Sequence, residues 1–173
     1  DLGAAHWAQT IREIKRLNPE TTTEVLIPDF QGRKELVDQV IKACPEIISH
    51  NMETVKRISP QVRSAANYHT SLEVIRQIAE SGITAKSGIM VGLGETPAEV
   101  EELMDDLISV GCKILTIGQY LQPTHFPVAA YITPEQFAVY KETGLKKGFE
   151  QVESAPLVRS SYHAEKHIRF NNK

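Results

Sequence analysis

Short apolar runs and longer amphipathic segments alternate along almost the whole chain. Between the runs, apolar residues recur every three or four positions, which is the spacing of one face of an α-helix. Buried strands that alternate with amphipathic helices are typical of parallel βαβ units, so the pattern predicts one α/β domain with a parallel sheet. The predicted strands are 24–28, 47–51, 83–93 and 113–120, followed by an extended stretch over 149–158.

Five helices are predicted, one before the first strand and four between the strands. Thr96-Pro97-x-Glu99 and Thr133-Pro134-x-Gln136 are capping boxes with proline at the first helical position, so each predicts a helix start. Four parallel strands do not close a barrel, so either the sheet is open or earlier strands are missing. The other three helices are predicted over 4–17, over 34–43 and from Tyr68 to Gly82.

Composition and charge exclude several classes of protein. The 173 residues are 41% hydrophobic and 24% charged, with a net charge of −3, so nothing indicates a nucleic-acid-binding protein. No apolar run approaches the roughly 18 residues of a membrane span, and residues 1–6 do not resemble a signal peptide. Cys44 and Cys112 have no metal-binding spacing and are expected to be two buried thiols in a reducing cytoplasm.

Polar and glycine residues gather where the predicted strands end. Each has an ordinary explanation: Asn51 could cap a helix, Glu53 could favour a helix start, and Gly92-x-Gly94-Glu95 could be a tight turn. Because the carboxyl ends of parallel strands carry the active site in such folds, four polar strand ends favour a functional site instead. These ends are 29–32, 50–54, 92–96 and 118–123, with Lys86 and Ser87 on the third strand.

Asn51 and Glu53 carry the most specific chemistry at these strand ends. On an extended strand, residues two positions apart project to the same side. An amide and a carboxylate placed in this way can bracket the two hydroxyls of a ribose, and a glycine-rich strand lets an adenine edge approach the backbone. The sequence therefore predicts a nucleoside site.

Five landmark segments are spread over almost the whole chain. They are VLIPDFQG (25–32), HNMETV (50–55), KSGIMVGLGET (86–96), TIGQYLQP (116–123) and PLVRSSYHA (156–164). With these motifs the chain resembles lipoyl synthases. The last segment is the most discriminating, whereas GLGET and HNxET-like segments also occur in related enzymes such as biotin synthase.

The resemblance implies a fold and a set of cofactors. The fold would be a partial (β/α)₆ TIM-like barrel of the radical S-adenosylmethionine (SAM) type, with its first strands absent from this chain. Residues 1–150 would be the C-terminal portion of that barrel, and 151–173 an extension carrying Arg-Ser-Ser-Tyr. The cofactors would be SAM and two [4Fe-4S] clusters, whose cysteine ligands lie outside this segment.

The resemblance also implies an activity and its partners. Two sulfur atoms would be inserted at C6 and C8 of an octanoyl group on a lipoyl carrier domain, such as the E2 component of a 2-oxoacid dehydrogenase or the glycine cleavage H protein. Flavodoxin or ferredoxin would supply electrons in a bacterial cytoplasm. Without the cluster cysteines, the segment alone would be inactive.

Individual roles follow from the same resemblance. Ser161 would be the fourth ligand of the auxiliary cluster, and Arg159 would act beside it; without the cluster, 159–173 would lose its anchor. A barrel without its first strands would leave a poorly covered inner face near Leu26, Ile89 and Ile117. The expected cofactor-binding residues are Asn51, Glu53, Lys86, Ser87, Gly92, Gly94, Glu95, Gln119, Tyr120 and Leu121.

Two other readings of the sequence stay open. One is a different radical SAM enzyme that inserts sulfur, similar to biotin synthase. The other is a cluster-free fragment that binds a nucleoside or a carrier protein. The Arg-Ser-Ser-Tyr segment argues against the first. The iron content of the full-length protein would separate the synthase from the cluster-free fragment.

Overall fold

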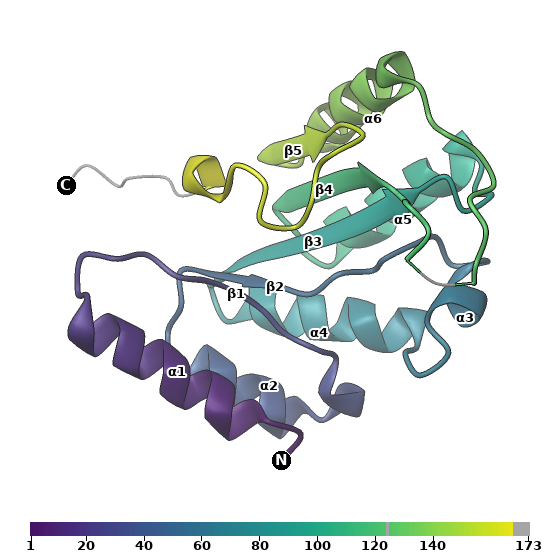
Figure 1. The fold of residues 1–173 in the computed structure, drawn as a ribbon. Coiled ribbons are helices and arrows are strands. Elements are labelled where there is room, and N and C mark those ends of the chain that lie inside the picture. Colours follow the sequence, from purple (N-terminus) through teal and green to yellow (C-terminus); the bar gives the residue numbers. More distant parts are fainter. Residues whose placement is uncertain (124, 168–173) are drawn as a thin grey trace.

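Five parallel strands form a single open sheet in a computed structural model that describes residues 1–123 and 125–167 (Figure 1). Their order in the sheet, β1-β2-β3-β4-β5, is also their order along the chain. The strands are β1 (Glu24–Leu26), β2 (Ile47–Ser49), β3 (Thr84–Val91), β4 (Ile114–Gln119) and β5 (Gln151–Ser154). The predicted extended stretch is thus a fifth parallel strand, and the predicted α/β class is confirmed.

Helices connect each strand to the next and pack along one face of the sheet (Figure 1). All five predicted helices are present, while the four-residue α3 and the two 3₁₀ helices were not predicted. The helices are α1 (Ala4–Leu17), α2 (Lys34–Ile41), α3 (Ser59–Val62), α4 (Tyr68–Glu80), α5 (Pro97–Ser109) and α6 (Pro134–Lys147), with 3₁₀ helices η1 (Phe30–Gly32) and η2 (Ala164–His167).

The helix starts follow the sequence signals. The Thr96 hydroxyl accepts the N–H of Glu99 at 3.3 Å, and the Glu99 carboxylate accepts the N–H of Thr96 at 2.8 Å, which completes the predicted capping box of α5. At α6 the Thr133 hydroxyl accepts the N–H of Gln136 at 3.3 Å. Each such cap stabilises its helix by about 1 kcal/mol.

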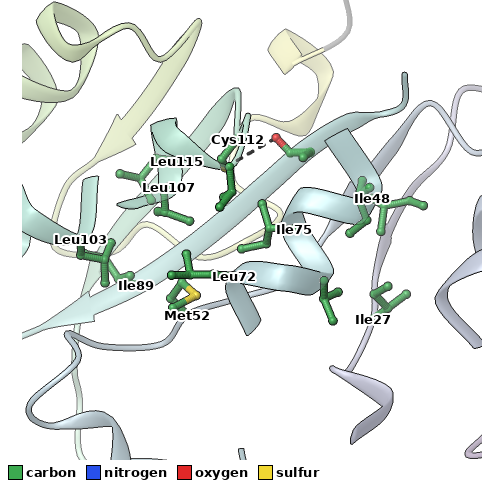
Figure 2. Close-up of a cluster of buried hydrophobic side chains, with 14 of the residues drawn as sticks. Ile27, Ile48, Met52, Leu72, Ile75, Ile89, Leu103, Leu107, Cys112 and Leu115 are labelled. Carbon is green, nitrogen blue, oxygen red and sulfur yellow. Dashed lines mark hydrogen bonds between the residues drawn. The ribbon is translucent and has the colours of Figure 1, made fainter. Parts of the chain in front are cut away.

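The hydrophobic core lies between the sheet and the helices. Figure 2 shows Ile89 of β3 among Met52, Leu72 of α4 and Leu103 of α5, and Ile89 is only 4% exposed. Burying one such side chain contributes about 1.5–3 kcal/mol, so this layer fixes which face of each strand meets the helices.

Side chains alternate between the two faces of a strand, and this alternation corrects one prediction. Ile89 and Ile117 were expected at the hollow inner face, but they point into the helix-covered core and are buried. Leu26 lies on the other face and is 47% exposed, as expected there. We call this second face the inner face; it carries Leu26, Lys86, Gly88, Met90, Thr116 and Gly118.

Candidate functional site

Asn51 and Glu53 follow β2 at the carboxyl edge of the sheet, where two cavities adjoin. Both residues line both cavities, so the structure brings them together as predicted. The outer cavity, about 440 Å³, is lined further by Trp7, Leu26, Ile27, Pro28, Asp29, His50, Arg63, Ala65 and Ala66. The inner cavity, about 130 Å³, is lined further by Gly88, Ile89, Met90, Thr116, Gly118, Val158, Arg159 and Ser160.

The backbone of Glu53 differs from the extended strand that the prediction assumed. Its φ is 64°, in the left-handed region, and β2 has already ended at Ser49. The N–H of Glu53 donates to Gly88 O at 3.0 Å, and its carbonyl accepts the N–H of Met90 at 2.8 Å. A non-glycine residue keeps such a conformation only where its surroundings hold it, so these two bonds to β3 fix the Glu53 backbone.

Asn51 presents an unsatisfied oxygen beside a glycine. Its Oδ1 is buried and has no recorded hydrogen bond among the described residues. A β-carbon on Gly88 would lie 2.9 Å from this oxygen and 2.6 Å from Thr116 Oγ1, so only glycine leaves the space open. Because a buried polar atom without a partner costs about 1–3 kcal/mol, the arrangement favours a hydrogen-bond donor bound here.

A buried polar network holds the segment that carries Asn51. His50 contacts Ile27 O through Nδ1 and Ser71 Oγ through Nε2, both at 2.9 Å. Arg63 donates to Ser71 Oγ at 3.0 Å and to Met52 O at 3.3 Å. Burial lowers the pKa of His50 and also that of Arg63, although the nearby Glu53 carboxylate partly opposes the second shift.

Lys86 and Ser87 lie on opposite faces of β3, so the structure does not bring them together. Lys86 is fully buried on the inner face and donates to Glu24 Oε1 of β1 at 2.5 Å. Burial lowers the pKa of Lys86, against the effect of the Glu24 carboxylate. Ser87 faces the helices, where its Oγ accepts the N–H of Met52 at 3.3 Å. Ser87 therefore supports the Asn51 segment from behind.

Gly92, Gly94 and Glu95 form a tight turn between β3 and α5. The Glu95 carboxylate accepts the N–H of Gly92 at 2.6 Å and that of Leu93 at 2.9 Å. Both glycines have positive φ, 98° and 102°. A β-carbon on Gly92 would lie 2.4 Å from Ala130 O, so the segment after β4 already occupies the space against this turn.

Gln119, Tyr120 and Leu121 hold that same segment. Gln119 Nε2 donates to the Ala130 carbonyl at 3.1 Å, and its Oε1 accepts the N–H of Ile132 at 2.9 Å. The Tyr120 hydroxyl donates to Phe126 O at 2.8 Å. Leu121 is 50% exposed at the end of β4. In this structure Gln119 and Tyr120 order the connection after β4, and their backbone N–H groups donate to Pro156 O and Val91 O.

The segment beyond β5 crosses the inner face, as the yellow ribbon in Figure 1 shows. We call residues 155–163 the C-terminal strap. It continues the pairing with β4, because Ala155 N–H donates to Ile117 O at 3.2 Å and Gln119 N–H donates to Pro156 O at 3.1 Å. These bonds end at Pro156, so the expected loss of an anchor over 159–173 stays a prediction, and 168–173 lie outside the described residues.

The three motif residues of the strap occupy different surroundings. Arg159, which is exposed, and Ser160, which is half-buried, both line the inner cavity, whereas Ser161 is exposed and is not among its lining residues. Arg159 Nη1 donates to Val158 O at 2.6 Å. The hydroxyl of Ser161 has no recorded hydrogen bond within residues 1–123 and 125–167, so it is available to a group outside them.

No metal site is found within the described residues. They contain no group of three histidine, cysteine or carboxylate side chains that could hold an ion.

Cys112 is buried as predicted, and burial raises its pKa to about 12. Cys44 is exposed, contrary to the prediction, because it lies in the turn after α2 with φ 55°. Within the described residues no helix is long and apolar enough to cross a membrane.

The carboxyl edge of the sheet carries the kinds of group that the prediction of a nucleoside site requires. Asn51 offers an unsatisfied acceptor, Glu53 a carboxylate, and Gly88 a strand without a side chain. Sequence reasoning named the first two and placed His50 and Gly118 within the polar strand ends, but it missed Gly88 and the supporting residue Arg63. A glycine inside an otherwise apolar strand is the signal that could have found Gly88, since it marks a close approach of another backbone or a ligand.

Comparison with known proteins gives closely similar relatives. A family model described as the radical SAM superfamily matches residues 3–107. A lipoyl synthase of Bacteroides fragilis is 99% identical over 175 aligned positions, which cover 100% of this chain and 61% of the relative. A lipoyl synthase of Phocaeicola vulgatus is 79% identical, over 98% of this chain and 61% of the relative. The chain thus spans about three fifths of the length of these relatives.

Solved structures with low sequence identity share the fold. Methylornithine synthase has a TM-score of 0.67 at 10% identity, over 95% of this chain and 58% of that one. A domain of pyruvate-formate lyase-activating enzyme from Bacteroides vulgatus has a TM-score of 0.64 at 16% identity, over 89% of this chain and 95% of that one. With the family match, they confirm the predicted radical SAM type of partial barrel.

Proposed function

Because the chain belongs to the radical SAM superfamily and its sequence is that of a lipoyl synthase segment, we propose that it is part of an enzyme that inserts two sulfur atoms, at C6 and C8, into a protein-bound octanoyl group. The observation that carries this proposal is the 99% identity to a lipoyl synthase along the entire chain. The Arg-Ser-Ser-Tyr segment at 159–162 supports it, since it sets the chain apart from biotin synthase-like enzymes.

The nature of the proposed substrate implies that the reaction needs no general base from this chain. An unactivated C–H bond has no acidity that a side chain could exploit, so a cofactor must supply the reactive species. SAM with a reduced [4Fe-4S] cluster supplies, when bound, a carbon radical that removes a hydrogen atom. The part left to this chain is to bind and orient the nucleoside and to exclude water.

Asn51 and Glu53 are the residues that hold the ribose in this proposal. They share both cavities at the carboxyl edge of the sheet, and the Asn51 oxygen lacks a partner in the described residues. The backbones of Gly92–Gly94 and Gln119–Leu121 line the adenine side in this proposal, and the side chains of Glu95, Gln119 and Tyr120 order these two strand ends. Lys86 lines neither cavity and is paired with Glu24 of β1, so its part in this proposal is to support the sheet that carries the site.

Ser161 is the residue proposed to bind the auxiliary cluster. Its exposed position at the strap leaves its hydroxyl free to reach a cluster held by cysteines outside this chain. Iron in such clusters is usually held by thiolate, and an alkoxide on a surface segment could leave more readily. We assign 1–150 to the barrel and 151–173 to the extension, although β5 of that extension completes the sheet.

The partners follow from the same assignment. The substrates would be octanoylated carrier domains of 2-oxoacid dehydrogenases and of the glycine cleavage system, with flavodoxin or ferredoxin as the reductant in the bacterial cytoplasm. No nucleic acid or membrane is involved in this scheme.

Iron content and product analysis test the proposal. The full-length protein, reconstituted without oxygen, should hold about eight iron atoms in two clusters and convert an octanoylated H protein to its lipoyl form, as followed by mass spectrometry. Conversion of dethiobiotin in place of the octanoyl protein would indicate a biotin synthase-like enzyme. Protein without iron would indicate a cluster-free binding fragment.

A further inference from the structure

The C-terminal strap lies directly on β4 because Gly118 has no side chain. A β-carbon at Gly118 would lie 2.2 Å from Val158 O and 3.2 Å from Arg159 Nη1. The first distance is too short for any side chain, and the obstacle is backbone. Gly118 therefore fixes the strap against the inner face, next to the strand that carries Gly88.

This seating turns Arg159 and Ser160 toward the site of Asn51 and Glu53. All four residues line the inner cavity of about 130 Å³. The guanidinium of Arg159 is held by its bond to Val158 O at 2.6 Å, which keeps it close to Gly118. The next residue, Ser161, is exposed and does not line the cavity.

The two walls of the inner cavity carry opposite charges. Glu53 contributes a carboxylate from the sheet side, and Arg159 contributes a guanidinium from the strap side. Within the described residues no salt bridge is recorded for Arg159 or for Glu53. The cavity is thus lined by an acceptor for hydroxyls on one side and by a planar cation on the other.

We propose that Arg159 and Ser160 form the wall of the nucleoside site opposite Asn51 and Glu53, so that nucleoside binding fixes the strap and with it the position of Ser161. The proposal rests on the proposed binding of SAM. It gives the motif residues separate tasks: Arg159 and Ser160 contact the adenosyl group, and Ser161 faces the auxiliary cluster. A guanidinium can stack on the face of a purine, and a hydroxyl can complete the hydrogen bonds of the ribose.

Binding measurements test the assignment without turnover. The affinities of SAM and of 5′-deoxyadenosine would be measured by calorimetry on the full-length, reconstituted protein. We expect Arg159→Ala and Ser160→Ala each to weaken both ligands by roughly fivefold or more, which is the effect of losing about 1 kcal/mol. Leu157→Ala, on an exposed strap residue, is the matched control and should leave both affinities unchanged.

Comparing the affinities for SAM and for 5′-deoxyadenosine distinguishes the possible roles of the strap. If Arg159→Ala weakens SAM alone, Arg159 contacts the methionine carboxylate and the nucleoside assignment is wrong. If neither substitution changes either affinity, the strap is not part of the site, although the proposed function stands. A wild-type protein that binds neither ligand would overturn the proposed function as well.

Hydrogen exchange of the strap provides the second readout. Adding 5′-deoxyadenosine should slow amide exchange in residues 155–163 of the wild-type protein. The Gly118→Ala variant should exchange rapidly in this segment with or without ligand, because the added methyl group displaces Val158. If the amide exchange rate of the wild-type strap is the same with and without 5′-deoxyadenosine, the proposed coupling is wrong.

Discussion

The Oδ1 atom of Asn51 lies 2.9 Å from the position that a β-carbon would take on Gly88. The amide of Asn51 and the bare backbone of β3 thus meet at one point of the inner cavity. Gly88 could not gain a side chain without moving the Asn51 amide.

Gly88→Ala should therefore weaken SAM binding. The methyl group would approach Thr116 Oγ1 to 2.6 Å and push the Asn51 amide out of place. We expect at least a roughly tenfold loss of affinity in calorimetry, equivalent to about 1.4 kcal/mol. Ser109→Ala, at the end of α5 and outside both cavities, is the control: it removes a hydrogen bond to Asp106 O and should leave SAM affinity intact. Equal affinities for both variants would contradict the geometry.

Asn51→Ala should lower the affinity for SAM without lowering the stability of the ligand-free protein. Its Oδ1 is buried without a recorded partner, so its removal should not lower, and could raise, the melting temperature of the ligand-free protein. SAM affinity should fall, as it should for Glu53→Ala, where loss of a hydrogen bond to a charged group costs about 1.5–3 kcal/mol. Thermal melts with and without SAM would measure both effects. A destabilised apo protein with normal SAM affinity would assign Asn51 to the fold alone.

His50 should make stability depend on pH. Burial lowers its pKa below the ordinary value of 6.5, with Arg63 adding to the shift and Asp29 opposing it. The unfolded chain therefore binds the proton first, so the stability that neutral His50 provides is present above pH 6.5 and is lost as the pH falls. We expect the free energy of unfolding to decline by up to about 1.4 kcal/mol per pH unit from this residue.

The comparison with His50→Gln isolates this contribution, since glutamine cannot titrate but can keep a hydrogen bond to Ser71. Urea unfolding between pH 7 and pH 5 should give a flatter profile for the variant. Parallel profiles would mean that groups other than His50 account for the whole acid dependence.

Gln119→Leu should destabilise the protein through the segment after β4. The buried amide makes three recorded bonds, to Tyr120 O at 3.0 Å, to Ala130 O at 3.1 Å and from Ile132 N–H at 2.9 Å. Their loss should cost about 2–4 kcal/mol in urea unfolding. Gln61→Leu, at an exposed position, should change stability by less than about 0.5 kcal/mol.

The fold could be predicted from the sequence because the helices and strands have clear periods. The capping box at Thr96 and the apolar strand over 83–93 both appear where expected, with the strand shortened to Thr84–Val91. The helix Ser59–Val62 escaped prediction because four residues are too few to show a helical period. Ile89 and Ile117 were placed on the wrong face, since an almost continuously apolar strand gives no alternation to read.

The site could be predicted only in part. Asn51 and Glu53 were recognised by residue type, but the left-handed φ of Glu53 depends on bonds to β3, which lies more than thirty positions away in the chain. The roles of Glu95 and Gln119 likewise depend on which backbone groups fold against them. Lys86 and Ser87 are neighbours in the chain but lie on opposite faces, as the period of two in a strand requires.

Trp7 is the single tryptophan of the 173 residues, and its place at the free side of β1 has a practical consequence. Its indole N–H donates to Leu26 O at 3.1 Å, and its ring borders the outer cavity that also holds Asn51 and Glu53. Indole emission shifts with the hydration of the ring and with its hydrogen bond. The chain therefore contains an intrinsic fluorescent reporter. Its emission wavelength should shift when a ligand fills that cavity or when another strand covers the edge of β1.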